Sequence, residues 1–379
     1  MRTSSHLLLL LSSLSFPLFT SAEQVYSGFD PRAYEKRSAT CKAVQREQGG
    51  AVVDIKLSYV DINPNGSRTL LMVHGWPSLW SSWSYQIQEF KADYHLIVPD
   101  LRGFGESGHP GGVKNSGTLF DIVGDLTCIL EDAGVEKTVC VGHDWGSEVC
   151  YEAARSRPDI FEGVVGAVVP YTPSAGNYTP VSALTSVLPK LTYQLYFDQK
   201  TAQATEELNK DIRRSVRATL RTVDSPPPDD FLKSSDNYLD AWENYKEIPP
   251  VPFFDKNEED YFVESYEKSG FENTLEFYTD DNRYLNWKYE NAQGNFTIPQ
   301  PVIAILPTQD PVADWAVASK LLKAADFLPN LTTKMLPGAH WVQLEYPELF
   351  NAEMRKWLEE HFPPTPIVAE KNVHVHEEL

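Results

Sequence analysis

The residues best suited to chemistry lie in a short run from Val139 to Ser147, in which Asp144 stands between Gly142 and Gly146. A β-branched stretch precedes Asp144 and an amphipathic helical pattern follows it. This layout is typical of a nucleophile elbow, a tight strand-to-helix turn that lifts one side chain clear of a sheet. A carboxylate in that place attacks an electrophilic carbon directly and forms an ester with it. Taken alone, the run is equally well explained as a glycine-bounded turn with an N-capping aspartate.

Two further residues follow apolar runs that read as strands. Asp310 comes after residues 301–306, and His340 comes after residues 332–336. In the order Asp144, Asp310, His340, we expect a nucleophile, an acid that orients the imidazole, and a base that activates water. Individually, Asp310 is equally well explained as a helix cap and His340 as a hydrogen-bonded loop histidine. The occurrence of all three at expected strand ends, in the required order, favours a catalytic set.

A third strand end carries the sequence His74-Gly75-Trp76-Pro77 after the apolar run 69–73. Loops at the carboxyl ends of parallel strands are where sheets of this kind build their sites. The backbone N–H groups of Trp76 and Trp145 are therefore predicted to form an oxyanion hole, which needs no side-chain chemistry.

The elements that must position these residues alternate between strand and helix patterns. Strands are expected at 52–60, 69–73, 95–99, before Asp144, and at 164–169, 301–306 and 332–336, with helices at 79–90, 119–130 and 347–362. This alternation predicts an α/β fold, a mostly parallel twisted sheet flanked by helices. The glycine-rich turn at residues 100–107 is expected to be structural, held by a contact between Arg102 and a carboxylate.

One long segment breaks the alternation. Residues 171–300 are rich in Tyr, Asp, Glu and Pro, with helical patterns at 202–220 and 258–268 and no convincing strand. An insertion of this size between two strands predicts a helical lid over the pocket. The expected division is a leader at 1–22, the first part of the core at 23–170, the lid at 171–300, the second part of the core at 301–365, and a tail at 366–379.

These motifs resemble the epoxide hydrolase branch of the α/β-hydrolase family, over nearly the whole chain after the leader. The matching pieces are His74-Gly75-Trp76-Pro77, Gly142-His143-Asp144-Trp145-Gly146, Asp310 and Gly338-Ala339-His340-Trp341. The resemblance implies an α/β-hydrolase fold with a helical lid. It also implies conversion of small hydrophobic epoxides to diols by water, with no metal or organic cofactor.

Within the lid, the resemblance implies that Tyr193 and Tyr278 bind the epoxide oxygen and supply its proton. The lid is rich in tyrosine, so Tyr196 and Tyr284 are alternatives for that role. One position departs from the family pattern: relatives usually carry Glu after the His-Gly-aromatic-Pro loop, whereas this chain has Ser78. The hydrogen bonding around the hydrolytic water is therefore expected to differ.

Two other functions remain open at this point. Haloalkane dehalogenases share the aspartate nucleophile, but many of them use Asn in the His74 to Pro77 loop to hold the halide. Trp76 lacks that donor, although its indole N–H is a different one. The second alternative is a hydrolase fold kept as a ligand-binding module. A damaged triad is the usual sign of such a module, and this triad is intact in sequence.

The N-terminus predicts a secretory route. Arg2 precedes an apolar run over residues 7–19, and a small-residue site favours cleavage after Ala22. A membrane anchor is the alternative, but serines and a proline interrupt the run. Sequons begin at Asn65, Asn177, Asn295 and Asn330, as suits a lumenal or secreted glycoprotein. The final residues, 376–379, resemble an ER-retention signal, with an unspecific acidic tail as the alternative.

Net charge and cysteine spacing narrow the possible classes of function. The net charge of −20 argues against nucleic-acid binding, because no excess of Lys and Arg is present to displace counterions from phosphate. Four cysteines, Cys41, Cys128, Cys140 and Cys150, lack the spacing of a metal site. Buried free thiols are the favoured expectation, and the sequence supports no disulfide pairing. It also leaves open the oligomeric state and the particular epoxide.

Overall fold

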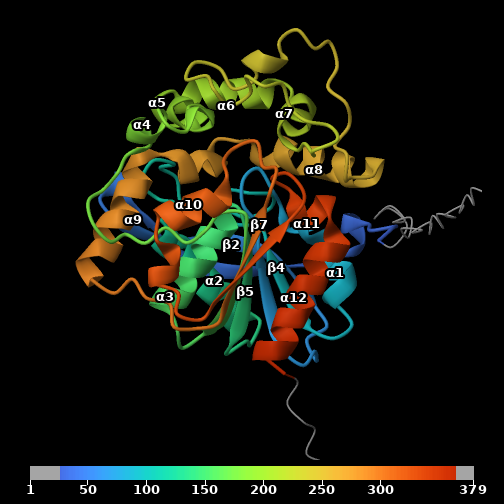
Figure 1. The fold of residues 1–379 in the computed structure, drawn as a ribbon, viewed down its shortest axis with the longest axis vertical. Coiled ribbons are helices and arrows are strands. Elements are labelled where there is room, and N and C mark those ends of the chain that lie inside the picture. The colour runs from blue at the N-terminus through green and yellow to red at the C-terminus, as the bar shows by residue number, and fades with distance from the viewer. Residues whose placement is uncertain (1–25, 364–379) are drawn as a thin grey trace, which may run out of the picture.

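Residues 26–363 are described by the computed structural model of the chain, and they contain one eight-stranded sheet with helices on both faces (Figure 1). The spatial order of the strands is β1-β2-β4-β3-β5-β6-β7-β8. Pairing is antiparallel from β1 to β2 and from β2 to β4, and parallel across the rest of the sheet. The strands span β1 Lys36–Gln45, β2 Ala51–Ile62, β3 Thr69–Val73, β4 His95–Pro99, β5 Thr138–His143, β6 Phe161–Ala167, β7 Val302–Pro307 and β8 Leu331–Leu336.

The register of the central strands brings the chemistry-bearing loops to one edge. Val73 of β3 pairs with Gly142 of β5, and Gly142 pairs in turn with Gly166 of β6. Gly166 pairs with Ala304 of β7. Because parallel strands in register end at the same edge, the loops that follow β3, β5 and β7 meet there.

Helices pack on both faces of the sheet, which is why its central strands read as continuous apolar runs. Helices α1 (Ser84–Phe90) and α12 (Pro347–His361) pack together on one face, and α2 (Leu119–Asp132) and α3 (Trp145–Ser156) on the other. The helix expected at 119–130 is α2, whose apolar side chains are buried, and a capping box between Thr118 and Asp121 starts it. In the turn before α2, Arg102 makes two hydrogen bonds with Asp125, at 2.6 and 2.7 Å, as the sequence predicts.

The strand β1 was not expected, since it lies in a segment that reads as a polar lead-in. Its inward positions are held by the small residues Ala39, Cys41 and Ala43, which give a weak alternation of hydrophobicity. The helix expected at 79–90 is also shorter, because a 3₁₀ turn over Trp80–Trp83 precedes α1.

Only helices and irregular segments occupy the described chain between β6 and β7. They include α4 Val181–Leu184, α5 Tyr193–Gln199, α6 Thr201–Lys210, α7 Ile212–Thr219, α8 Lys256–Ser269 and α9 Asp280–Gln293. Helices α4 to α8 lie over one edge of the sheet, at the top of Figure 1. The single helix expected at 202–220 is interrupted at Asp211, whose non-helical backbone ends α6 and whose carboxylate caps α7 by accepting from the Arg214 N–H. The exact domain boundaries stay a prediction. After β7 come α10 Trp315–Leu321 and α11 Val342–Glu345.

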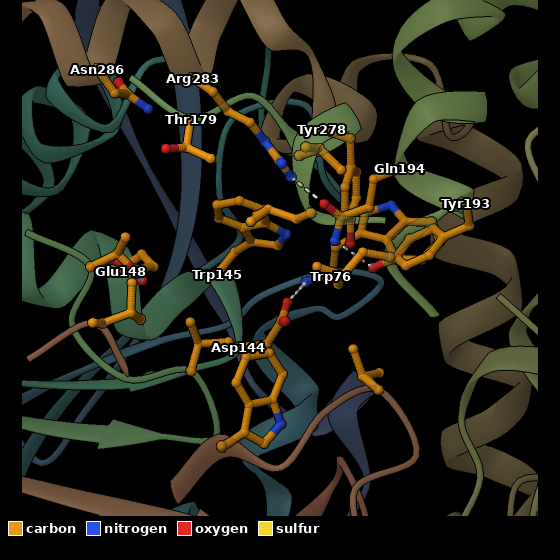
Figure 2. Close-up of a pocket in the computed structure, with 18 of the residues that line it drawn as sticks. Trp76, Asp144, Trp145, Glu148, Thr179, Tyr193, Gln194, Tyr278, Arg283 and Asn286 are labelled. Atoms are coloured by element: carbon orange, nitrogen blue, oxygen red, sulfur yellow. Dashed lines mark hydrogen bonds between the residues drawn. The ribbon is translucent and has the colours of Figure 1, made fainter. Parts of the chain in front are cut away.

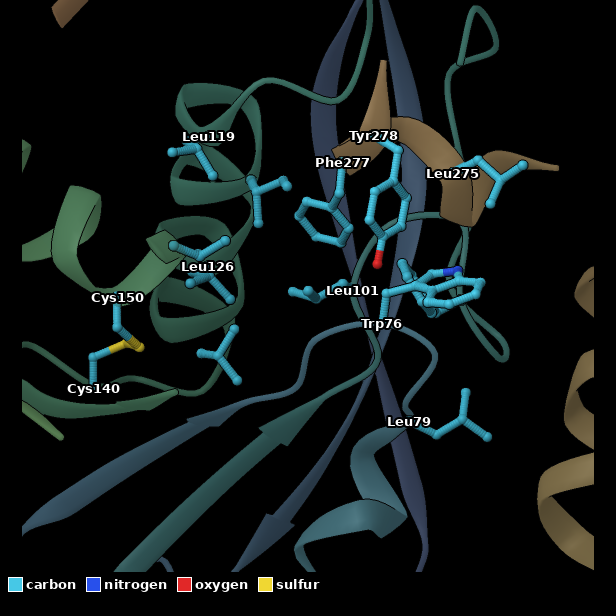
Figure 3. Close-up of a cluster of buried hydrophobic side chains, with 14 of the residues drawn as sticks. Trp76, Leu79, Leu101, Leu119, Leu126, Cys140, Cys150, Leu275, Phe277 and Tyr278 are labelled. Carbon is cyan, nitrogen blue, oxygen red and sulfur yellow. A yellow bond between two sulfur atoms is a disulfide. The ribbon is translucent and has the colours of Figure 1, made fainter. Parts of the chain in front are cut away.

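The expectation of free thiols is wrong, because all four cysteines are paired: Cys41 with Cys128, and Cys140 with Cys150. The first bond joins the unexpected strand β1 to α2. Without a predicted β1, the sequence gives no reason to place Cys41 near Cys128. The second joins β5 to α3 on either side of the elbow (Figure 3). The spacing of the cysteines along the sequence does not show that either pair is close in space.

No helix within residues 26–363 has the length and hydrophobicity needed to span a membrane. The expected leader cleavage after Ala22 and the C-terminal retention signal lie outside the described residues.

Candidate active site

Asp144 occupies the tight turn that the sequence predicts. It is the residue before α3, with φ 55° and ψ −125°, a conformation that non-glycine residues rarely adopt. A Cβ on Gly142 would overlap the Gly146 backbone, and one on Gly146 would overlap the Val73 backbone. A Cβ on Gly75 would overlap the Asp144 side chain itself. Glycine at these three positions therefore lets the loop after β3 approach the nucleophile closely.

The two carboxylate oxygens of Asp144 have different partners. The Trp76 N–H donates to Oδ1 at 2.9 Å, and Nε2 of His340 lies 3.4 Å from Oδ2. Burial alone would raise the pKa of Asp144, but the hydrogen bond and charge of His340 outweigh it and hold the pKa below its usual value. Asp144 is therefore ionised and available as a nucleophile. No hydrogen bond from the Trp145 N–H to Asp144 is found in the described chain, so that half of the oxyanion hole stays a prediction.

His340 is fixed from its other side by Asp310. Its Nδ1 lies 2.8 Å from Asp310 Oδ2, and that carboxylate also accepts hydrogen bonds from the Trp315 indole at 2.6 Å and the Val312 N–H at 2.8 Å. Burial disfavours the imidazolium, but Asp310 and Asp144 outweigh it and raise the pKa of His340 to about 10. The structure thus brings together the three residues that the sequence proposes as a triad.

A second histidine, beside the nucleophile, was not singled out by the sequence. His143 is buried, and its Nε2 lies 2.9 Å from the backbone oxygen of His340. Burial and the neighbouring His340 charge lower the pKa of His143 to about 4, so it is neutral. A neutral His143 supports the loop that carries His340 without adding a competing charge.

A cavity of about 820 Å³ lies between the elbow and the helical segment, and its lining residues include Asp144, Trp76, Trp145 and His340. Figure 2 shows the first three of these side chains together. The indole N–H of Trp76 donates to Thr274 Oγ1 at 3.1 Å. That donor is therefore occupied and is not free to hold a halide. Among residues 26–363, no group of three His, Cys, Asp or Glu side chains is arranged to hold a metal ion.

Tyr193 and Tyr278 line the same cavity from two different segments. Tyr193 begins α5, Tyr278 ends the 3₁₀ helix η7 (Asn273–Tyr278), and their ring centroids are 5.6 Å apart. Burial raises the pKa of Tyr193 to about 12, with a further contribution from the Asp144 charge, and burial raises the pKa of Tyr278 as well. Both phenols keep their protons at neutral pH, as a proton donor must.

The two alternative tyrosines do not line the cavity. Tyr196 is buried, and its hydroxyl interacts with Glu207. Tyr284 is 43% exposed and packs on Tyr178 and Trp287. A different tyrosine, Tyr238, does line the cavity and was missed. Its hydroxyl is 3.1 Å from Thr219 Oγ1, and only the fold brings it beside Tyr193.

Glu148 is a further residue that sequence reasoning missed. It lies one helical turn after Asp144 on α3, lines the cavity, and accepts a hydrogen bond of 2.7 Å from Thr172 Oγ1. Burial raises the pKa of Glu148 to about 7. In the sequence, only its spacing of one helical turn from Asp144 could have indicated that Glu148 lines the cavity. The residues that bury it come from distant segments.

Ser78, which departs from the family pattern, is fully buried. Its Oγ has no hydrogen-bond partner among the described residues, and its carbonyl accepts a hydrogen bond of 3.3 Å from the Tyr266 hydroxyl.

Comparison with known proteins gives a consistent result. The α/β hydrolase fold family matches residues 68–347. Over 313 residues, the chain is 28% identical to epoxide hydrolase A of Mycobacterium tuberculosis, covering 80% of this chain and 94% of that protein. It is 26% identical to bifunctional epoxide hydrolase 2 of Sus scrofa, covering 80% of this chain and 53% of that longer protein.

Solved structures show the same similarity. The crystal structure of epoxide hydrolase A from Mycobacterium thermoresistibile superposes with a TM-score of 0.70 at 26% identity, covering 86% of this chain and 98% of that one. An epoxide hydrolase from an endophytic Streptomyces superposes with a TM-score of 0.71 at 26% identity, covering 86% and 95% of the two chains.

Proposed function

Because the chain belongs to the α/β hydrolase fold family, we propose that it is an epoxide hydrolase, which converts epoxides to vicinal diols through an ester on Asp144. The observation that carries this proposal is the position of Asp144 in one cavity with Tyr193 and Tyr278. An ionised carboxylate supplies the nucleophile, and two protonated phenols supply the acid that an alkoxide leaving group needs. The relatives named as epoxide hydrolases support the same activity.

In the first step, Oδ2 of Asp144 attacks an oxirane carbon and the carbon–oxygen bond of the ring breaks. A phenol proton passes to the departing oxygen, which gives a hydroxyalkyl ester and leaves a tyrosinate. Oδ1 becomes the carbonyl oxygen of the ester and keeps its hydrogen bond from the Trp76 N–H. The ester carbonyl therefore forms in a position where a backbone donor already faces it.

In the second step, His340 takes a proton from a water molecule, and the hydroxide adds to the ester carbon of Asp144. The resulting oxyanion at Oδ1 is stabilised by the Trp76 N–H, while Asp310 holds the imidazolium. Collapse of this intermediate breaks its bond to the diol oxygen, and the imidazolium of His340 protonates the departing alkoxide. Asp144 is left as a carboxylic acid whose proton restores the Tyr hydroxyl, so the carboxylate is regenerated and no cofactor enters either step.

Dehalogenation gains no support from this site, because the Trp76 indole is occupied by Thr274. A purely ligand-binding role would not need His340 held between Asp310 and Asp144. The test is a panel of styrene-type, terminal aliphatic and fatty-acid epoxides alongside haloalkanes and esters. Diol release from epoxides alone is the expected result. Halide or carboxylic acid release without diol would contradict the proposal.

The proposal includes a secretory route, with the leader removed after Ala22 and N-linked glycans added. All four sequon asparagines, Asn65, Asn177, Asn295 and Asn330, are exposed. The two disulfides suit an oxidising compartment. The C-terminal residues 376–379 would retain the protein in the ER lumen, and without recognition of that tail it would be secreted.

A further inference from the structure

The side-chain amide of Gln194 lies between Arg283 and Tyr193 in the wall of the cavity (Figure 2). Nη2 of Arg283 donates to Gln194 Oε1 at 2.9 Å, and Nε2 of Gln194 donates to the Tyr193 hydroxyl oxygen at 3.2 Å. Gln194 is 8% exposed, so its amide has little access to water in place of these partners. The three side chains form a directed chain of hydrogen bonds that ends on a phenol.

The direction of this chain follows from the chemistry of its first member. A guanidinium only donates hydrogen bonds, so the oxygen of the Gln194 amide must face Arg283. The NH₂ group must then face Tyr193, whose oxygen accepts. The reverse orientation would direct the amide oxygen at Tyr193 and capture the phenolic proton. Arg283 therefore sets the orientation of the Gln194 amide, and this orientation leaves the Tyr193 proton available to another acceptor.

Arg283 is itself held in place by the two segments that carry the catalytic groups. Its Nε donates to the Phe277 carbonyl at 2.9 Å, next to Tyr278, and its guanidinium lies 4.9 Å from the ring centroid of Trp145, next to Asp144. No carboxylate of the described chain forms an ion pair with it, and burial lowers its pKa. The guanidinium is partly shielded from water without a carboxylate partner, so its hydrogen bonds and the Trp145 ring offset the hydration that it loses.

We propose that Gln194, oriented by Arg283, is a positioning residue that keeps the proton of Tyr193 directed at the epoxide oxygen. This inference rests on the proposed epoxide hydrolysis and adds two residues to it. The hydrogen bond from Gln194 also lowers the pKa of Tyr193 against the effect of burial. It therefore stabilises the tyrosinate that remains when the proton passes to the ring-opened oxygen.

The substitution Gln194→Glu tests the proposal directly. A carboxylate at this position keeps the size of the side chain and its contact with Arg283, but it accepts the Tyr193 proton instead of donating to the oxygen. The rate of ester formation should fall by 10-fold or more, towards the loss expected for Tyr193→Phe, while substrate affinity changes little. Gln199→Glu provides the matched control: it adds the same charge to an exposed position of α5 and should alkylate at the wild-type rate.

A second variant separates positioning from structural support. Gln194→Met removes the contact with Arg283 but cannot capture the Tyr193 proton, so it should retain more activity than Gln194→Glu. If Gln194 serves only to anchor Arg283, the order reverses, because the carboxylate keeps that anchor and methionine does not. Likewise, Arg283→Lys retains a donor for the amide oxygen and should remain more active than Arg283→Met.

The decisive measurement is a double-mutant cycle on the alkylation rate constant, followed by rapid quenching and intact-mass detection of the ester. Once Tyr193 is Phe, Gln194→Glu should cause almost no further loss, because no phenolic proton remains to be directed. An equal loss in both backgrounds, or a Gln194→Glu variant as fast as the wild type, would overturn the proposal. A wild-type protein that forms neither ester nor diol would instead overturn the proposed function.

Discussion

His340 lies between two carboxylates, with its Nδ1 2.8 Å from Asp310 and its Nε2 3.4 Å from Asp144. Together they raise the pKa of His340 to about 10, despite burial, so the free enzyme carries an imidazolium. An imidazolium is not a base. Ester formation converts Asp144 to a neutral group and removes one of the two charges, so the pKa of His340 falls and the imidazolium releases its proton to solvent. The neutral ring can then accept a proton from the hydrolytic water.

The first prediction follows from this relationship. In Asp144→Asn, which mimics the neutral ester, the pKa of His340 should fall below its wild-type value of about 10. Heteronuclear NMR of the labelled imidazole across a pH titration measures this directly. Asp236→Asn, at an exposed lid carboxylate, is the matched control and should leave the titration unchanged. An unchanged pKa in Asp144→Asn would show that Asp310 alone sets the charge on His340.

The lid tyrosines give the second prediction. Tyr193→Phe and Tyr278→Phe each remove a hydroxyl while keeping the ring that lines the cavity. The alkylation rate should fall by about 10²–10⁴-fold in each single variant, the range typical of a positioned general acid, and further in the double variant. Tyr196→Phe, outside the cavity, is the control. If the double variant opens epoxides at the wild-type rate, the acid is a different group, and Tyr238 is the cavity-lining tyrosine to test next.

The third prediction concerns stability. Burial raises the pKa of Glu148 from 4.5 to about 7, so between these values the folded protein holds a proton that the unfolded chain has lost. The free energy of unfolding therefore falls as pH rises through this window. Glu148→Gln should be more stable than the wild type at pH 8, by at most about 3 kcal/mol, with little difference near pH 4.5. Urea unfolding at both pH values measures this, and a pH-independent difference would contradict it.

The fourth prediction is that protein from a eukaryotic host starts at Glu23 and carries N-linked glycans. Asn65, Asn177, Asn295 and Asn330 are all exposed, as suits surface glycans. Intact-mass analysis before and after enzymatic deglycosylation should show the loss of residues 1–22 and a glycan-sized decrease. Recovery of the uncleaved, unglycosylated chain from the cytosol would rule out the secretory route.

The sequence predicted the parts of this fold that local patterns encode. Each triad residue closely follows an apolar run that reads as a strand. For Asp144, the flanking glycines also mark the tight turn. The triad assembles because parallel strands end at one edge, a general rule that needs no coordinates. Its residues were therefore identifiable, although their catalytic roles stay predictions.

The remaining features depend on contacts between distant segments. Small inward residues hide β1, and without β1 the bond between Cys41 and Cys128 has no basis in sequence. The choice among lid tyrosines depends on which faces of several short helices point inward. The orientation of Gln194 depends on Arg283, which is 89 residues away along the chain. Patterns of hydrophobicity carry no information about such pairs.

The central claim, a covalent ester on Asp144, is tested most directly by a single turnover in ¹⁸O-labelled water with enzyme in excess over epoxide. The account predicts that label enters the Asp144 carboxylate, as read by mass spectrometry of the peptide, while the diol of that first turnover takes its oxygen from unlabelled Asp144. Label in the diol from the first turnover, with none in Asp144, would show that water attacks the epoxide directly and would contradict the account.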